Sequence, residues 1–338
     1  MNFKRLIALL LLLCTLACAV ACNGADDDNT DGSATADQTE EEPTEKATKK
    51  PSGEKATEPP ARLEDTEGLD LEIKMLSQNL SPRDRSNGNS IDERFSRFEA
   101  MVNEIGPDVI ATQEGGKEWV GKLKDLEEYG FCGISSYGKR SMGGLWNAIL
   151  YKKERFVLMD EGDFWVGEDI KNASIAAGAM EKRICSWVEL FDRYTGESIV
   201  VASSQLDHAC ETVRQTQLGQ LARALKAALG KRYTDMPVYI ALDLKTDTYS
   251  DTYFDMISAR GYDDVRNLAL EDRSEGYGAN HFFGSAEKGK DECFWFARGY
   301  GEVLSYEIIT KKYKGEKDTE AGYVSDHYGI LITLGAAQ

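Results

Sequence analysis

The fold of this 338-residue chain is decided by the stretch Pro107-Asp108-Val109-Ile110-Ala111-Thr112-Gln113-Glu114. Gly106-Pro107 ends the segment before it, because proline cannot continue a helix. The apolar residues that follow predict a short strand, and this strand delivers the polar pair Gln113-Glu114 at its end. A polar side chain at a strand end is a common place for chemistry in a mixed α/β domain.

Other predicted strands also end in, or begin after, polar side chains. They are Asn79 at the end of 70–80, Gln205 at the end of 197–206, Asp243 after 237–242, and Asp326-His327 before 328–334. Carboxylate and amide oxygens are hard ligands that suit Mg²⁺ or Ca²⁺. Each residue alone is more often a turn or cap residue. Their shared position predicts a single site built from several strand ends.

The rest of the chain alternates pairs of strands with helices. Ser90-Ile91-Asp92-Glu93 is a capping box, and a helix is predicted after it. Further helices are predicted at about 115–127, 210–229 and 251–259, and further strands at 146–152, 155–159, 161–166, 184–191, 293–297 and 302–310. Residues 192–196 have the composition of a hairpin turn. This order favours the α/β class, as a two-sheet α/β sandwich with helices on the outer faces, in one domain spanning 69–338.

The N-terminal part is not domain material. Residues 1–22 have a basic start, a short apolar run and small residues before Cys22, which is typical of a secretory signal. Ala19-Val20-Ala21-Cys22 resembles a bacterial lipobox, so we expect lipidation of Cys22 and an exported protein anchored to the outer face of the bacterial cell membrane. Ordinary signal cleavage and free secretion is the alternative. Residues 23–68 are acidic and poor in large apolar residues, which predicts a disordered tether.

The charge of the domain limits its partners. The whole chain carries a formal charge of −18, of which about −11 lies in residues 69–338. An acidic domain lacks the basic surface that binding to polymeric nucleic acid requires. The domain holds Cys132, Cys185, Cys210 and Cys293 without any CxxC spacing, so a zinc site is not expected. Their disulfide pairing stays open, and buried unpaired cysteines are an equal alternative.

Seven motifs, in order along the chain, resemble those of the endonuclease/exonuclease/phosphatase superfamily, which has the deoxyribonuclease-I-like fold. They are Met75–Asn79, Pro107–Glu114, Trp146-Asn147-Ala148-Ile149-Leu150-Tyr151, Arg183 before the Trp187 strand, Ser203–His208, Leu242-Asp243-Leu244-Lys245 and Ser325-Asp326-His327-Tyr328. The Pro-Asp…Gln-Glu motif is the most specific of them. The resemblance covers about 69–338.

The resemblance implies a metal-dependent phosphoester hydrolase. Glu114 and Asn79 would hold Mg²⁺, with Mn²⁺ or Ca²⁺ as alternatives, and the ion would polarise a phosphoryl oxygen. Further roles are carried over by motif. The catalytic positions are Asp243, Asp326, His327 and Arg183, and the substrate-binding positions are Asn147, Lys245 and His281.

Several family positions are changed in this chain. The imidazole of the Asn-Thr-His motif is replaced by Gln205, and its partner carboxylate by Leu145. Glutamine does not titrate in the useful range, so it cannot act as a general acid or base. The amide of the Gly-Asp-Phe-Asn motif is Lys245, which could give positive charge to a phosphate or be a solvated lysine. The late-strand Asp falls on Cys293, or on Glu292 after a shift of one residue.

Two main functions remain open. The chain could be a membrane-anchored phosphodiesterase or phosphatase with reduced or altered activity, acting as a monomer on a phosphoester small molecule or a lipid head group. Alternatively, it could be a non-catalytic lipoprotein that binds a phosphoester or a partner with the same fold. A tethered surface domain whose interaction site lies away from the strand ends is a third possibility.

Overall fold

We describe the protein from a computed structural model, which covers residues 58–83 and 85–335. The signal sequence, Cys22 and residues 23–57 of the expected tether lie outside the described residues. Within the described ranges no helix is long and apolar enough to cross a membrane. Arg62 and Leu63, which we assigned to the tether, bond to the 192–196 turn: Arg62 Nε donates to the Tyr194 carbonyl and the Leu63 amide to the Arg193 carbonyl. The ordered domain therefore extends at least a few residues before the predicted boundary at 69.

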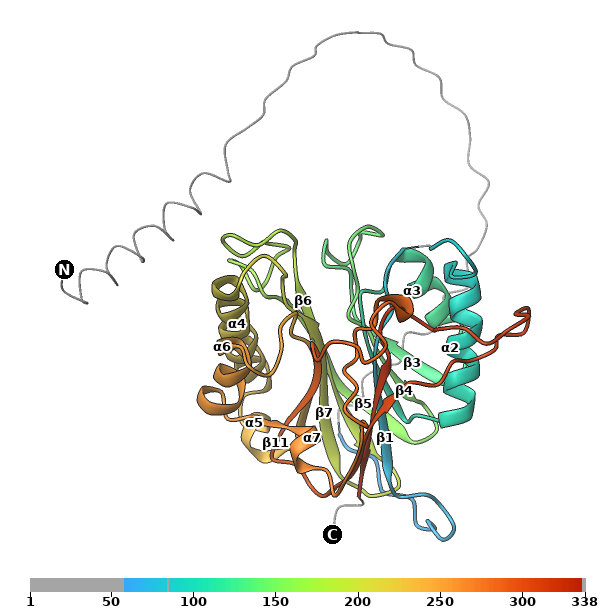
Figure 1. The fold of residues 1–338 in the computed structure, drawn as a ribbon. Helices are drawn as coiled ribbons and strands as arrows, with labels where there is room; N and C mark the ends of the chain where they lie inside the picture. Colours follow the sequence, from blue (N-terminus) through green and yellow to red (C-terminus); the bar gives the residue numbers. More distant parts are fainter. Residues whose placement is uncertain (1–57, 84, 336–338) are drawn as a thin grey trace, which may run out of the picture. The chain divides into compact units, whose positions relative to one another are not determined.

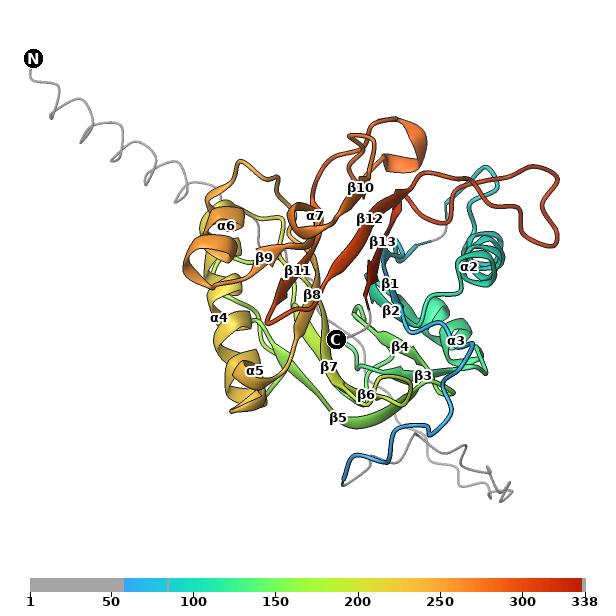
Figure 2. The same ribbon diagram turned by 90° about the horizontal axis from the view of Figure 1, so that it is seen from below.

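Two β-sheets form the centre of the domain (Figures 1 and 2). The seven-stranded sheet has the order β10-β12-β13-β1-β2-β4-β3, with β1 Ile73–Asn79, β2 Val109–Gln113, β3 Tyr129–Cys132, β4 Ile149–Lys152, β10 Glu271–Arg273, β12 Val303–Ile309 and β13 Gly329–Leu334. The six-stranded sheet has the order β5-β6-β7-β8-β11-β9, with β5 Phe156–Trp165, β6 Ile184–Asp192, β7 Ser198–Gln205, β8 Val238–Asp243, β9 Asp263–Asp264 and β11 Cys293–Arg298. The predicted two-sheet sandwich is confirmed.

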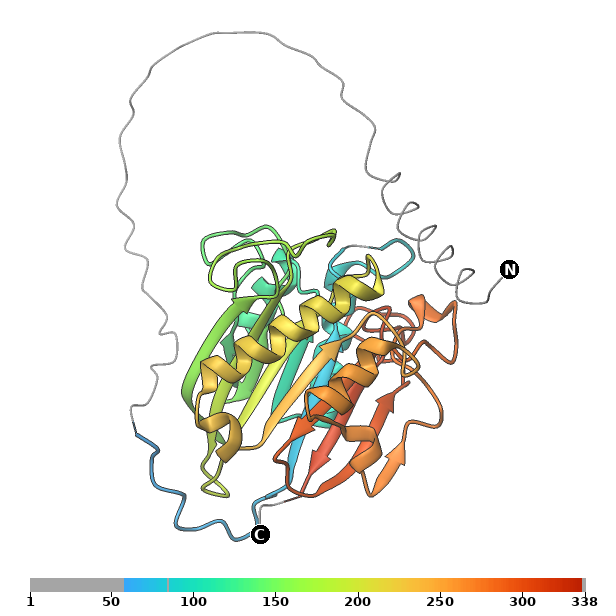
Figure 3. The same cartoon turned by 90° about the vertical axis from the view of Figure 1, so that its left-hand side faces the viewer.

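Helices cover the outer face of each sheet. The outer helices are α2 Ile91–Ile105, α3 Lys117–Lys124, α4 Glu211–Leu229, α5 Arg232–Asp235 and α6 Asp251–Phe254, with a π-helical turn at Asp255–Ala259 and a 3-10 turn at Phe282–Gly284. The short helix α7 Val265–Leu268 instead contacts β11 and β12, and its Val265 belongs to the apolar cluster between the sheets. Figure 3 shows α4 crossing the face of the six-stranded sheet. The capping box of α2 forms as predicted: Ser90 and Glu93 bond reciprocally, and Gly106 ends the helix at φ 64°.

Three apolar layers hold these elements together. The central layer lies between the sheets and joins Met75 and Val109 of one sheet to Val201 and Trp295 of the other. A second layer packs α4 and α6 on the six-stranded sheet, and a third packs α2 and α3 on the seven-stranded sheet. Because both faces of each sheet are covered, strands such as β2 are buried at every position and have no polar alternation.

The strands predicted at 155–159 and 161–166 form one continuous strand, β5, whose pairing with β6 shifts register between Leu158 and Asp160. A β-bulge of this kind breaks the alternation without ending the strand, which explains the error. No disulfide forms among the described cysteines: Cys132, Cys185 and Cys293 are buried, and Cys210 is exposed.

Candidate functional site

The polar strand ends converge at one end of the sandwich because of the strand directions. β1 and β2 run parallel, and so do β7 and β8, so each pair carries its polar residues to the same edge. The antiparallel partner strands begin at this same edge, so the residues at or before their first positions join the cluster. β11 starts at Cys293 opposite Asp243, and β13 starts just after His327. The structure thus brings together six of the positions expected from the sequence: Asn79, Glu114, Gln205, Asp243, Asp326 and His327.

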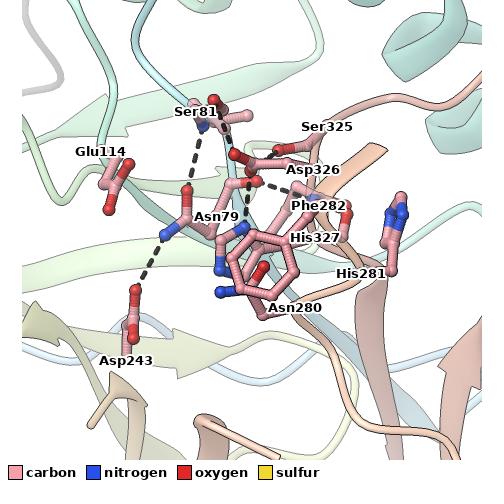
Figure 4. A network of polar contacts seen from close by, with 12 residues as sticks. Asn79, Ser81, Glu114, Asp243, Asn280, His281, Phe282, Ser325, Asp326 and His327 are labelled. Atoms are coloured by element: carbon pink, nitrogen blue, oxygen red, sulfur yellow. Dashed lines mark hydrogen bonds and ion pairs between the residues drawn. The ribbon is translucent and has the colours of Figure 1, made fainter. Parts of the chain in front are cut away.

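Asp243 is the centre of this cluster and is fully buried. Its Oδ2 atom accepts hydrogen bonds from Asn79 Nδ2 at 2.8 Å and from Gln205 Nε2 at 3.0 Å, and it lies 2.7 Å from Lys245 Nζ (Figure 4 shows the bond from Asn79). Burial opposes the charge on Asp243, but Lys245 and His327 outweigh it and lower the pKa of this carboxyl. Asp243 is therefore ionised and held by three donors of the chain itself.

Gln205, at the imidazole position of the family motif, is locked between charged groups. Its Nε2 also donates to Glu114 Oε1, and its Oε1 accepts from Arg183 Nη1. The amide orientation is determined, because a flipped amide would place its oxygen against two carboxylates and its nitrogen against a guanidinium. Arg183 also pairs with the buried Asp207 at 3.4 Å. Gln205 thus acts as a cross-link within the site and has no proton to exchange at neutral pH.

Glu114 follows β2 in the left-handed region at φ 57°, a conformation that costs a residue other than glycine about 1–2 kcal/mol. Its side chain is 17% exposed, and its Oε1 accepts from both Gln205 and Lys245. The other expected metal ligand, Asn79, accepts the Ser81 backbone N–H at Oδ1, 3.0 Å away. Glu114 Oε1 and Asn79 Oδ1, one oxygen from each expected ligand, thus already accept hydrogen bonds from this chain, and a divalent cation at either oxygen would have to displace those donors.

Asp326 and His327 form the best preserved part of the site. Asp326 Oδ1 lies 2.6 Å from His327 Nδ1, and Ser81 Oγ donates to Asp326 Oδ2 (Figure 4). Burial opposes both charges, but the pair outweighs it, which raises the pKa of His327 and lowers that of Asp326 well below its usual range. His327 Nε2 is buried without a hydrogen-bond partner among the described residues.

Cys293 occupies the late-strand position that the sequence left open. Its Sγ, one oxygen of Asp243 and a ring nitrogen of His327 all lie within 4.8 Å of one another, a group that could hold a metal ion. Burial, together with the charge on Asp243, raises the pKa of the Cys293 thiol well above its ordinary value. The alternative residue, Glu292, instead accepts a hydrogen bond from Asn280 Nδ2 at 2.9 Å. Of the two residues, Cys293 is therefore the one that lies beside Asp243 and His327.

The other positions predicted from the sequence, Asn147, His281 and Leu145, contact only the surrounding protein in the described part of the chain. Asn147 is buried, and its Nδ2 donates to the Ile184 carbonyl. His281 stacks on Tyr328 with ring centroids 3.9 Å apart, and burial, aided by the charge on His327, lowers its pKa to about 4. Leu145 lies half-buried in the loop before β4 and brings no charge to the site. The binding roles expected for Asn147 and His281 stay predictions.

Solved structures with this architecture are numerous. A mannosyl-6-phosphatase from Bacteroides thetaiotaomicron superposes with a TM-score of 0.70 at 21% identity, covering 78% of this chain and 100% of that one. An endonuclease/exonuclease/phosphatase family protein from the same organism gives 0.70 at 22%, covering 78% and 97%. This chain has the endonuclease/exonuclease/phosphatase fold.

More distant proteins share the fold as well. The catalytic domain of human Nocturnin, solved with a bound sulfate anion, gives a TM-score of 0.59 at 13% identity and covers 79% of this chain and 94% of that one. No protein-family model matches the chain. No curated protein matches it either. The deoxyribonuclease-I-like fold expected from the sequence is thus confirmed from structure.

Proposed function

We propose that this chain is a non-catalytic binding protein with the phosphoesterase fold, exported and tethered to the outer face of the bacterial cell membrane through lipidated Cys22. It acts as a monomer and binds a phosphoester or a partner without hydrolysing it. The observation that carries the proposal is the position of Gln205. Its amide occupies the place of the proton-transfer imidazole and bonds to both Glu114 and Asp243.

Two further substitutions support the same conclusion. Leu145 stands where an orienting carboxylate is expected, and Cys293 stands where His327 would find a second one. Loss of one general acid or base lowers a rate by on the order of 10²–10⁴. Losing the imidazole together with two carboxylates that orient such groups leaves little proton-transfer chemistry in the site.

A weak phosphoesterase is the second candidate, and His327 favours it. Its Nε2 has no partner among the described residues while Asp326 holds Nδ1, an arrangement that could still orient on a phosphoryl group. One of the most similar solved structures is a mannosyl-6-phosphatase, so phosphomonoesters belong among the substrates to be tested.

Hydrolysis assays separate the two candidates. The purified protein and its Glu114→Ala variant are incubated with Mg²⁺, Mn²⁺ or Ca²⁺ and with mannose 6-phosphate, p-nitrophenyl phosphate and bis-p-nitrophenyl phosphate. We expect both proteins to stay at the background rate. Turnover by the wild type that disappears in Glu114→Ala would establish the phosphoesterase instead. A Gln205→His/Leu145→Glu variant probes whether proton transfer can be restored.

The membrane tether has its own test. In a bacterial host with lipoprotein processing, radiolabelled palmitate should enter the wild-type chain, and Cys22→Ser should abolish the label and release the protein from the membrane fraction. Label that persists in Cys22→Ser would refute lipidation at this residue.

A further inference from the structure

Lys245 lies two residues after β8, in an unusual backbone conformation. Its φ is 57°, in the left-handed region that residues other than glycine seldom adopt. Its backbone N–H donates to Asp243 Oδ1 at 3.3 Å. A strained backbone persists only where the surroundings over-determine it, and such residues cluster at functional sites. Here the surroundings are the two carboxylates to which the side chain is bound.

The Lys245 ammonium lies between those carboxylates. Nζ is 2.7 Å from Asp243 Oδ2 and 3.0 Å from Glu114 Oε1, and the side chain is only 15% exposed. Burial opposes its charge, but Asp243 and Glu114 outweigh burial and raise the pKa of the amine far above its ordinary value. The two short contacts and the small exposed fraction of the side chain exclude a solvated strand-end lysine.

The amide side chains of the site are arranged around this ammonium. Asn79 donates to Asp243 through Nδ2 while its Oδ1 accepts from the Ser81 N–H, so a flipped amide would oppose like groups on both sides. A hard divalent cation needs several oxygen ligands pointing at one place. In this chain Glu114 Oε1 and Asp243 Oδ2 instead accept from the Lys245 ammonium and from side-chain amide N–H groups.

We propose that Lys245 takes the place of the divalent cation, as an internal counter-ion that neutralises Glu114 and Asp243 and keeps metal away from Glu114 and Asn79. An ammonium is a compact point charge and supplies the attraction that the two carboxylates require. It has no vacant coordination position, so it cannot activate a bound water as a metal ion does. The proposal deepens the proposed non-catalytic function and rests on it.

Mn²⁺ binding, measured by electron paramagnetic resonance on the full chain, tests this role. The variant Lys245→Met removes the charge and keeps a side chain of similar length. We expect no saturable Mn²⁺ binding by the wild type within the titrated range. Lys245→Met should bind Mn²⁺ with a dissociation constant roughly tenfold or more below the upper limit of that range, because a repelling charge is removed. Adding Glu114→Gln to the Lys245→Met variant should abolish the gain in Mn²⁺ binding. Lys245→Arg, which keeps a cation, and Lys153→Met, at an exposed lysine, should behave as the wild type.

Each outcome decides the proposal. Saturable Mn²⁺ binding by the wild type that Glu114→Gln removes would overturn it, and so would a folded Lys245→Met protein that binds no more Mn²⁺ than the wild type. If Lys245→Met does not fold, the wild type and its Glu114→Gln variant still decide: equal absence of binding supports the proposal. Hydrolysis by the wild type would refute the proposed function. Mn²⁺ bound at Glu114 in an inactive wild type would refute this inference alone.

Discussion

Replacing Lys245 by Met should destabilise the domain by about 3 kcal/mol at pH 7, the lower end of the range for breaking a buried ion pair. At the observed distances of 2.7 and 3.0 Å, the gross attractions are about 6 and 5.5 kcal/mol at an effective dielectric constant of about 20. Removing the ammonium from water offsets several kcal/mol of this. Met keeps most of the apolar packing of the lysine stem, so the loss is mainly electrostatic.

The penalty should depend on pH in a defined way. The pKa of Lys245 is raised in the folded state, so its contribution to the free energy of unfolding is fully present below its unfolded pKa of about 10.4. That contribution is lost progressively as the pH rises from there through the folded pKa. The pKa of Asp243 is lowered, so its contribution is present above its unfolded value of about 3.9 and is lost as the pH falls through the folded value. The difference between wild type and variant should therefore be constant from about pH 5 to 9 and shrink on either side.

Urea unfolding followed by tryptophan fluorescence measures this difference at pH 3, 7 and 11, since the change becomes measurable only beyond the unfolded pKa values. Lys153→Met is the matched control, because Lys153 is exposed and its loss should change the free energy of unfolding by less than about 0.5 kcal/mol. A loss below about 1 kcal/mol for Lys245→Met at pH 7, or a loss that does not change with pH, would show that the ion pairs do not hold the site together.

Two further changes test the other buried pairs by urea unfolding. Asp326→Asn should lower the free energy of unfolding most between about pH 4 and 6.5. The lowered pKa of Asp326 stabilises the fold above its unfolded value of about 3.9, and the raised pKa of His327 stabilises it below its unfolded value of about 6.5. A loss that keeps growing above pH 8 would contradict this pairing. Arg183→Met leaves the buried carboxylate of Asp207 and the Gln205 oxygen without their guanidinium, and should cost about 3 kcal/mol; a near-neutral effect would mean that Gln205 is not locked.

The positions of the site residues could be predicted because strand ends are visible in the sequence. Asn79, Glu114 and Asp243 each follow an apolar run, and parallel pairing of β1 with β2 and of β7 with β8 carries them to one edge. Their partners could not be predicted. The sequence left Lys245 as a phosphate donor or a solvated lysine, and neither alternative includes its pairing with Glu114, a residue 131 positions away.

Register was the second limit. The sequence could not decide between Glu292 and Cys293, because a shift by one residue moves every side chain of a strand to the opposite face. In the structure Cys293 pairs with Asp243, and its thiol lies beside His327. Glu292 instead accepts a hydrogen bond from Asn280, and a contact of this kind has no local sequence pattern by which it could be predicted.

The substitutions at 205 and 245 make sense only together. The sequence predicted that the metal ligands Asn79 and Glu114 are present and that the imidazole and its partner carboxylate are lost. In the structure, Gln205 and Lys245 both donate to Glu114 and Asp243. The two residues therefore share the hydrogen-bonding and charge requirements of the same pair of carboxylates. Two carboxylates this close and this buried repel each other unless a cation or several donors lie between them. Lysine supplies the cation and glutamine the donors, and neither is able to exchange a proton or bind an oxygen ligand as metal and imidazole do. If the proposed non-catalytic function is right, reversal of one substitution alone should leave the two carboxylates poorly neutralised and the protein inactive.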